Sequence, residues 1–180
     1  MTHLVNVVGA AGGAGVTTFT TLFGPAAREL PAAALSSPPP PKASPWTVIL
    51  ATEGVEQASA AVALRETAIA HGWRVAALAT RGPERTRPRP VTARFIPIMD
   101  DDRDATLRRV PHWPAATRRP LAELPQWDFQ RAGARGRRGQ GLPKPFVALF
   151  TAIVDDIARD HEQEAETDSQ AESISPSTSL

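Results

Sequence analysis

A glycine-rich segment near the N-terminus carries the clearest chemical content of the sequence. Residues 9–18 read GAAGGAGVTT and lie between a valine-rich run, 3–8, and an apolar stretch with helical spacing. In a turn between a strand and a helix, successive backbone N–H groups converge on one anion, and the helix dipole adds to the attraction. The sequence therefore predicts a phosphate-binding loop with these candidate binding residues: Gly12, Gly13, Ala14, Gly15, Val16, Thr17 and Thr18.

This segment resembles the deviant Walker A loop of the ParA/MinD family of SIMIBI-type P-loop proteins, whose order is Lys-Gly-Gly-x-Gly-Lys-Thr-Thr. The glycines and threonines of that order match Gly12, Gly13, Gly15, Thr17 and Thr18. The resemblance implies ATP or ADP with Mg²⁺ as ligand, and it implies Thr17 as the residue that would hold the metal.

Both lysines of the family order are absent, because Ala11 and Val16 occupy their positions. In a working site the lysine reaches the β- and γ-phosphates. Losing an electrostatic contact of this kind typically costs about 10²–10³ in rate. We therefore expect no hydrolysis by this loop alone. The alternative is an NTPase whose missing cation comes from a partner in trans or from another loop, with Arg81 and Arg85 as candidates.

Three later stretches are similar to the same family at lower specificity: TVILATEGVEQASAAVALRETA, RVAALATRGPER and ARFIPIMDDDRDATL. No strand carries the Walker B aspartate of the family, and the corresponding region offers only Glu53. The resemblance implies a shortened relative, close to an uncharacterised actinobacterial group of P-loop-like proteins. It further implies a non-catalytic binding or scaffold component in partitioning, positioning or mobile-element transfer, with a protein partner and a homodimer as expected assemblies.

Two arginine-rich segments favour a third class of function. Residues 81–90 and 131–141 are basic and loop-like, which suits phosphate contacts that do not read bases. A solvated loop in an arginine-rich sequence would look the same, and the acidic C-terminal stretch would compete with a polyanion. A basic DNA-associated accessory protein stays an alternative, with these candidate contacts: Arg131, Arg135, Arg137 and Arg138.

Apolar patterning predicts an α/β fold, namely a small parallel sheet of about four strands with flanking helices, like a shortened P-loop NTPase. The expected strands are 3–8, 46–51, 73–80 and 91–99. The expected helices are 17–30, which Gly24-Pro25 ends or kinks early, 55–71, a short one at 101–109, and 146–159. Trp113 and Trp127 are expected to attach the irregular region between the last two helices to the core, with a partner-binding surface as the alternative.

The expected organisation is one domain over 1–162, interrupted by an extended proline-rich surface linker at 31–45. Residues 163–180 are acidic and polar, so we expect a disordered tail. The 180-residue chain has no cysteine, which excludes disulfides and thiol chemistry. No apolar run approaches the roughly 20 residues of a membrane span, and the N-terminus lacks signal-peptide features. We therefore expect a cytoplasmic protein.

Overall fold

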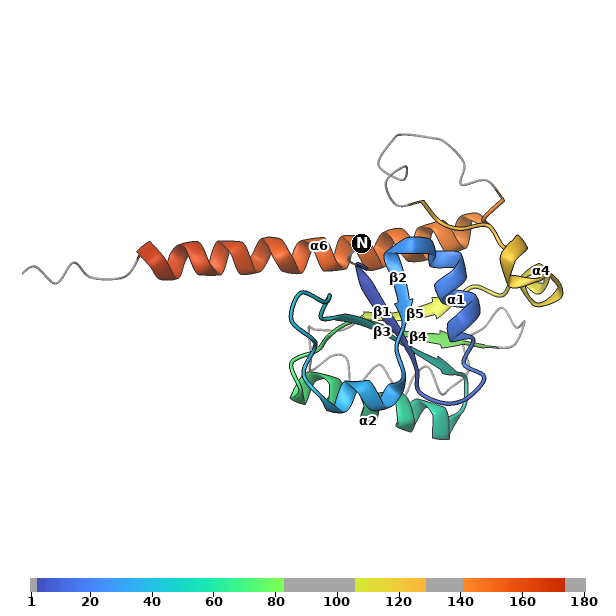
Figure 1. Cartoon of the computed structure of the whole chain (residues 1–180), viewed down its shortest axis with the longest axis horizontal. Coiled ribbons are helices and arrows are strands. Elements are labelled where there is room, and N and C mark those ends of the chain that lie inside the picture. The colour runs from blue at the N-terminus through green and yellow to red at the C-terminus, as the bar shows by residue number, and fades with distance from the viewer. Residues whose placement is uncertain (1–2, 83–105, 129–140, 174–180) are drawn as a thin grey trace, which may run out of the picture.

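The computed structural model describes residues 3–82, 106–128 and 141–173 (Figure 1). Within these residues, one sheet contains five strands in the order β2-β1-β3-β4-β5, and all neighbouring pairs are parallel. The strands are β1 (Val5–Gly9), β2 (Ala27–Glu29), β3 (Trp46–Thr52), β4 (Arg74–Arg81) and β5 (Thr106–Val110). The predicted α/β class with a parallel sheet and flanking helices is confirmed.

Helices cover both faces of this sheet (Figure 1). Helices α1 (Val16–Phe23) and α6 (Lys144–Ser173) lie on one face, and their apolar residues form one core cluster. On the other face, α2 (Val55–Ala70) and the 3₁₀ turn η2 (Ala32–Ser36) form a second cluster. Burial on both faces explains why β3 reads as a nearly continuous apolar run rather than an alternating one.

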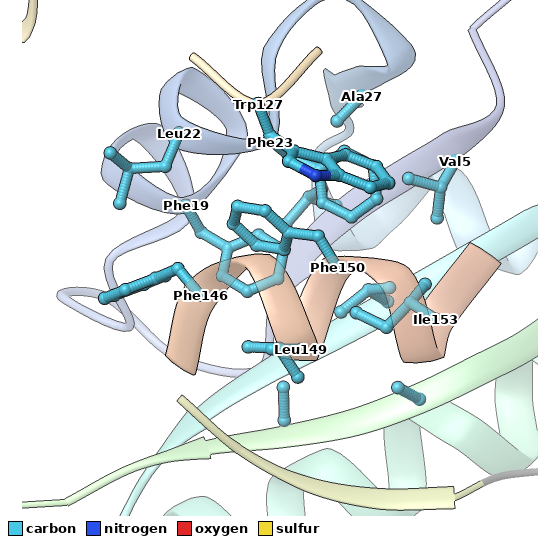
Figure 2. Packing of buried hydrophobic residues seen from close by; sticks show 14 of the residues in the cluster. Val5, Phe19, Leu22, Phe23, Ala27, Trp127, Phe146, Leu149, Phe150 and Ile153 are labelled. Atoms are coloured by element: carbon cyan, nitrogen blue, oxygen red, sulfur yellow. The ribbon is translucent and has the colours of Figure 1, made fainter. Parts of the chain in front are cut away.

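Aromatic side chains from distant segments meet between α1 and α6 (Figure 2). The ring of Phe150 lies 4.6 Å from that of Phe23 and 5.2 Å from that of Phe19, centroid to centroid. Trp127 packs edge-on against Phe23 at 5.3 Å. Trp113 lies 6.0 Å from the ring of Phe146. Both tryptophans thus attach the irregular segment to the core, as the sequence predicts.

The first helix and the region before β5 differ in detail from the prediction. Helix α1 ends at Phe23, so the expected early stop at Gly24-Pro25 is confirmed, and a 3₁₀ turn, η1 (Gly24–Ala26), leads into the unpredicted strand β2. The prediction of a helix at 101–109 is wrong for residues 106–109, because these residues pair with β4 as part of β5. Pairing with a neighbouring strand overrides local propensity there. The predicted strand at 91–99 lies outside the described residues.

The proline-rich segment 31–45 is attached to the domain more closely than its composition predicts. Leu35 is completely buried within the cluster on the α2 face. The indole nitrogen of Trp73 donates a hydrogen bond of 2.7 Å to the carbonyl of Ser37, and Asn6 Nδ2 donates one of 2.8 Å to Ser44. These contacts fix the path of the segment along the domain between β2 and β3.

Helix α6 continues as far as Ser173, past the expected end of the domain at residue 162, and its C-terminal half projects beyond the sheet (Figure 1). Glutamate, glutamine and alanine are good helix formers, and extending a helix that is already nucleated adds one hydrogen bond per residue. The composition predicted disorder there, because this stretch has almost no apolar side chains to bury. Within the described ranges, no helix has the length and apolar character needed to cross a membrane.

The contact between Trp46 and His161 is the last aromatic anchor of α6. Trp46 Nε1 donates a hydrogen bond of 3.2 Å to His161 Nε2, and Arg74 lies over the same indole ring at 5.1 Å. We expect His161→Ala to lower the free energy of unfolding by about 1 kcal/mol, the value of one hydrogen bond. Hydrogen exchange of the amides near residue 161 should become faster. The exposed Gln163→Ala serves as control, and equal exchange in both variants would show that the anchor does not stabilise the helix.

Candidate anion-binding site

The glycine loop leaves the carboxyl end of β1 and turns directly into α1. Gly13 and Gly15 have φ angles of +76° and +85°, in the left-handed region that favours glycine. Gly15 is the N-cap of α1. Gly12 and Gly13 are exposed, and a β carbon added at either would meet nothing within 4 Å. The glycines thus shape the turn and leave its tip open to a ligand.

Backbone N–H groups at the start of α1 are the donors that this site offers to a ligand. Ala10 N donates to Leu50 O at 2.8 Å and Phe19 N donates to Gly15 O at 2.9 Å. In the first turn of α1, the N–H groups of residues 16–18 have no acceptor within the helix. No side chain caps the start of α1 either. The donors at a free helix N-terminus attract an anion.

Arg81, the last residue of β4, brings a cation to this loop. A β carbon built on Gly15 would lie 3.1 Å from Nη1 of Arg81, so the guanidinium group lies directly against the N-cap of α1. None of the ion pairs in the described ranges involves Arg81. A guanidinium beside the positive end of a helix dipole is unfavourable on its own. An anion placed between them would interact favourably with both.

Glu53, the acid that follows β3 at the same edge of the sheet, is enclosed. Its N–H donates to the carbonyl of Arg81 at 2.9 Å, and its side chain is only 1% exposed. Nη2 of Arg109 lies 3.6 Å from its Oε1 atom. A β carbon at Gly82 would overlap the carboxyl group. Glu53 therefore acts as a buried partner of β5 in this structure.

The place of the loop in the sheet is a common location for ligands. Strand order reverses between β1 and β3, because the chain moves outward from β1 to β2 and then returns to the other side of β1. In doubly wound sheets with the order 2-1-3-4-5, ligands bind outside the carboxyl ends of the strands at this reversal.

The predicted site residues fall into three groups. Residues Gly12 to Thr18 lie together at the end of β1 and the start of α1, with Thr17 exposed and Thr18 half-buried. Arg81 lies beside them, whereas Arg85 and the candidate DNA contacts Arg131, Arg135, Arg137 and Arg138 lie outside the described residues. No group of three or more potential metal-ligating side chains occurs in the described ranges. Thr17 as a metal ligand stays a prediction.

The apolar residues that flank the loop are not predicted by the sequence. A cavity beside Gly15 and Arg81 is walled by Trp113 and Phe146, which are far away in the sequence. No local signal connects these residues with the glycine loop, since only the fold brings them together.

Comparisons with known proteins identify no relative of this chain, so its function is inferred from its fold and its site. No protein-family model matches the chain, and searches of curated proteins and of solved structures find no match either. The fold places the chain in the class of small all-parallel α/β proteins.

Proposed function

We propose that this chain is a non-catalytic, phosphate-binding α/β protein, a degenerate ParA/MinD-like P-loop protein that acts as a ligand-gated binding or scaffold component. The glycine loop, Gly12 to Thr18, would hold a phosphate group through its N–H groups. Arg81 would supply the charge that the absent lysines provide in the family. The position of the Arg81 guanidinium against Gly15, with no carboxylate paired to it in the described ranges, carries this proposal.

Arginine suits this role chemically. Its planar guanidinium binds phosphate with two parallel hydrogen bonds and stays charged at all physiological pH values. Hydrolysis would also need a group that orients the attacking water and charge at the γ-phosphate. The segment GAAGGAGVTT contains no acidic or basic side chain that could orient water or neutralise charge. Binding without turnover is therefore the expected behaviour.

Replacement of Arg81 by alanine tests the proposal. We expect the wild-type protein to bind ATP or ADP with Mg²⁺ in a calorimetric titration, and Arg81→Ala to bind about thirtyfold more weakly. That loss corresponds to one charge-assisted hydrogen-bonding contact of about 2 kcal/mol. Arg74→Ala is the matched control, because it removes the same charge from the other end of β4.

Two results would contradict the proposal. The first is the absence of heat and of thermal stabilisation with wild-type protein at millimolar ATP, ADP, GTP and inorganic phosphate. The second is an equal loss of affinity in Arg81→Ala and Arg74→Ala, which would indicate a general charge effect rather than a contact at the loop. Measurable phosphate release from ATP would contradict the non-catalytic part alone.

A further inference from the structure

A cavity of about 50 Å³ opens beside the glycine loop. Its lining comes from α1, from the ends of β3, β4 and β5, from residues 111–117 and from the first turn of α6, all within the described ranges. Most of the wall is apolar and consists of Phe19, Leu22, Leu50, Val110, Trp113 and Phe146.

The same cavity has a polar part next to the proposed phosphate site. Gly15, Thr18 and Arg81 all line it, and the Arg81 guanidinium lies against Gly15. A charged group that lines an apolar cavity, without a carboxylate partner among the described residues, fits a ligand that is anionic at one end and apolar at the other. A core packing defect would have apolar walls alone.

Cavity size limits the apolar end of such a ligand. An engineered apolar cavity of about 150 Å³ takes up benzene, and a single water needs about 10–15 Å³. At about 50 Å³, the space accommodates a group of roughly two to four carbon atoms.

We infer that the loop and Arg81 bind a small anion, a carboxylate or a phosphate monoester, that places a short aliphatic chain of about two to four carbons in this cavity. The inference rests on the proposed anion-binding function and specifies the ligand class for the same site. Phe19 and Leu22 of α1 contact the chain on one side, and Trp113 and Phe146 on the other.

Titration with a series of carboxylates of increasing chain length tests this inference. The probes are acetate, propionate, butyrate and hexanoate, observed through the indole N–H signals of the tryptophans in a ¹H–¹⁵N spectrum. Trp113 should shift, whereas Trp46 and Trp73, whose indoles are hydrogen-bonded elsewhere, serve as internal references. Each methylene that enters the cavity should tighten binding about fourfold, so butyrate should bind about fifteenfold more tightly than acetate. Hexanoate should gain little more, because the cavity is then full.

A parallel titration with methyl phosphate and n-propyl phosphate distinguishes the two anion classes, because this pair differs by two methylenes, as acetate and butyrate do. If n-propyl phosphate binds more tightly than butyrate, which carries the same three-carbon chain, the ligand is a phosphate monoester, and the reverse assigns a carboxylate. Butan-1-ol carries the chain without the charge and should bind weakly in both cases.

A variant that fills the cavity tests whether the aliphatic chain binds there. Ala116 lines the cavity and is 9% exposed, so Ala116→Leu should occupy the space of the aliphatic chain. We expect the variant to bind inorganic phosphate like wild type and to lose the dependence on chain length. If the leucine side chain disturbs folding, Ala116→Val can be used instead. It adds less volume and should lose only part of the dependence on chain length.

The possible failures of the two proposals are distinguishable. Phosphate binding without any chain-length dependence, or a dependence that Ala116→Leu leaves unchanged, would overturn the inference and leave the proposed function in place. Chain-length dependence with a Trp113 shift that survives Arg81→Ala would also overturn it, because the anion would not be at Arg81. No binding of any anion would overturn both.

Discussion

Truncation of Phe150 to alanine should lower the free energy of unfolding by about 4 kcal/mol, the middle of the range for buried phenylalanines. Phe150 is completely buried and contacts the rings of Phe19, Phe23, Phe146 and Trp127. Its removal would leave a cavity between α1 and α6 and would also remove several edge-to-face or tilted ring contacts. Urea unfolding followed by circular dichroism measures the change.

Two controls make this expectation specific. Phe150→Leu keeps most of the buried volume and should cost about 1.5 kcal/mol or less, which also provides a value if the alanine variant does not fold. Glu166→Ala changes an exposed residue on the projecting part of the same helix and should be nearly neutral. A loss below about 1 kcal/mol in Phe150→Ala would show that α6 does not pack on α1 as described.

The buried face of α6 could be predicted from sequence, because a helical period is a local signal. Phe146, Phe150, Ile153 and Ile157 are spaced for one face, and all four are buried. Their partners on α1 could not be predicted, since no pattern within either segment specifies the other. The same limit applies to β2 and β5, the short strands at the two ends of the sheet formed by the described residues. The sequence Ala27-Arg28-Glu29 has no apolar alternation, and only pairing with β1 makes it a strand.

In the candidate site, too, the local part can be predicted from the sequence, whereas the contacts between distant segments cannot. The glycine loop was recognisable because its turn and its helix are contiguous in sequence, and the structure explains two of its glycines by their positive φ angles. Arg81 could be named only as one of several arginines near a strand end. Its contact with Gly15 depends on the β1-β3-β4 order, which places the end of β4 two strands from the loop. The cavity is lined by five segments that are separate in the sequence, so no local pattern predicts it.

Placing a negative charge at the tip of the loop should have the largest effect on anion binding. In Gly13→Glu we expect the affinity for ADP or inorganic phosphate to fall by about a hundredfold, equivalent to about 3 kcal/mol, since like charges about 4 Å apart near a protein surface repel by a similar amount. Gly13 is exposed and an added β carbon would meet no neighbour within 4 Å, so the effect on folding should be limited to the strain of the left-handed backbone, about 1–2 kcal/mol.

Gly13→Lys separates charge from strain, because lysine brings the same backbone cost with the opposite charge. If the loop binds the anion, the lysine variant should bind at least as tightly as wild type, while both variants lose similar stability in thermal unfolding. An equal loss of binding in both would assign the effect to backbone conformation, and unchanged binding in both would place the anion away from the loop. Since the family order has lysine at two positions of this loop and the present chain has none, tighter binding by Gly13→Lys would also indicate that Arg81 replaces that charge only in part.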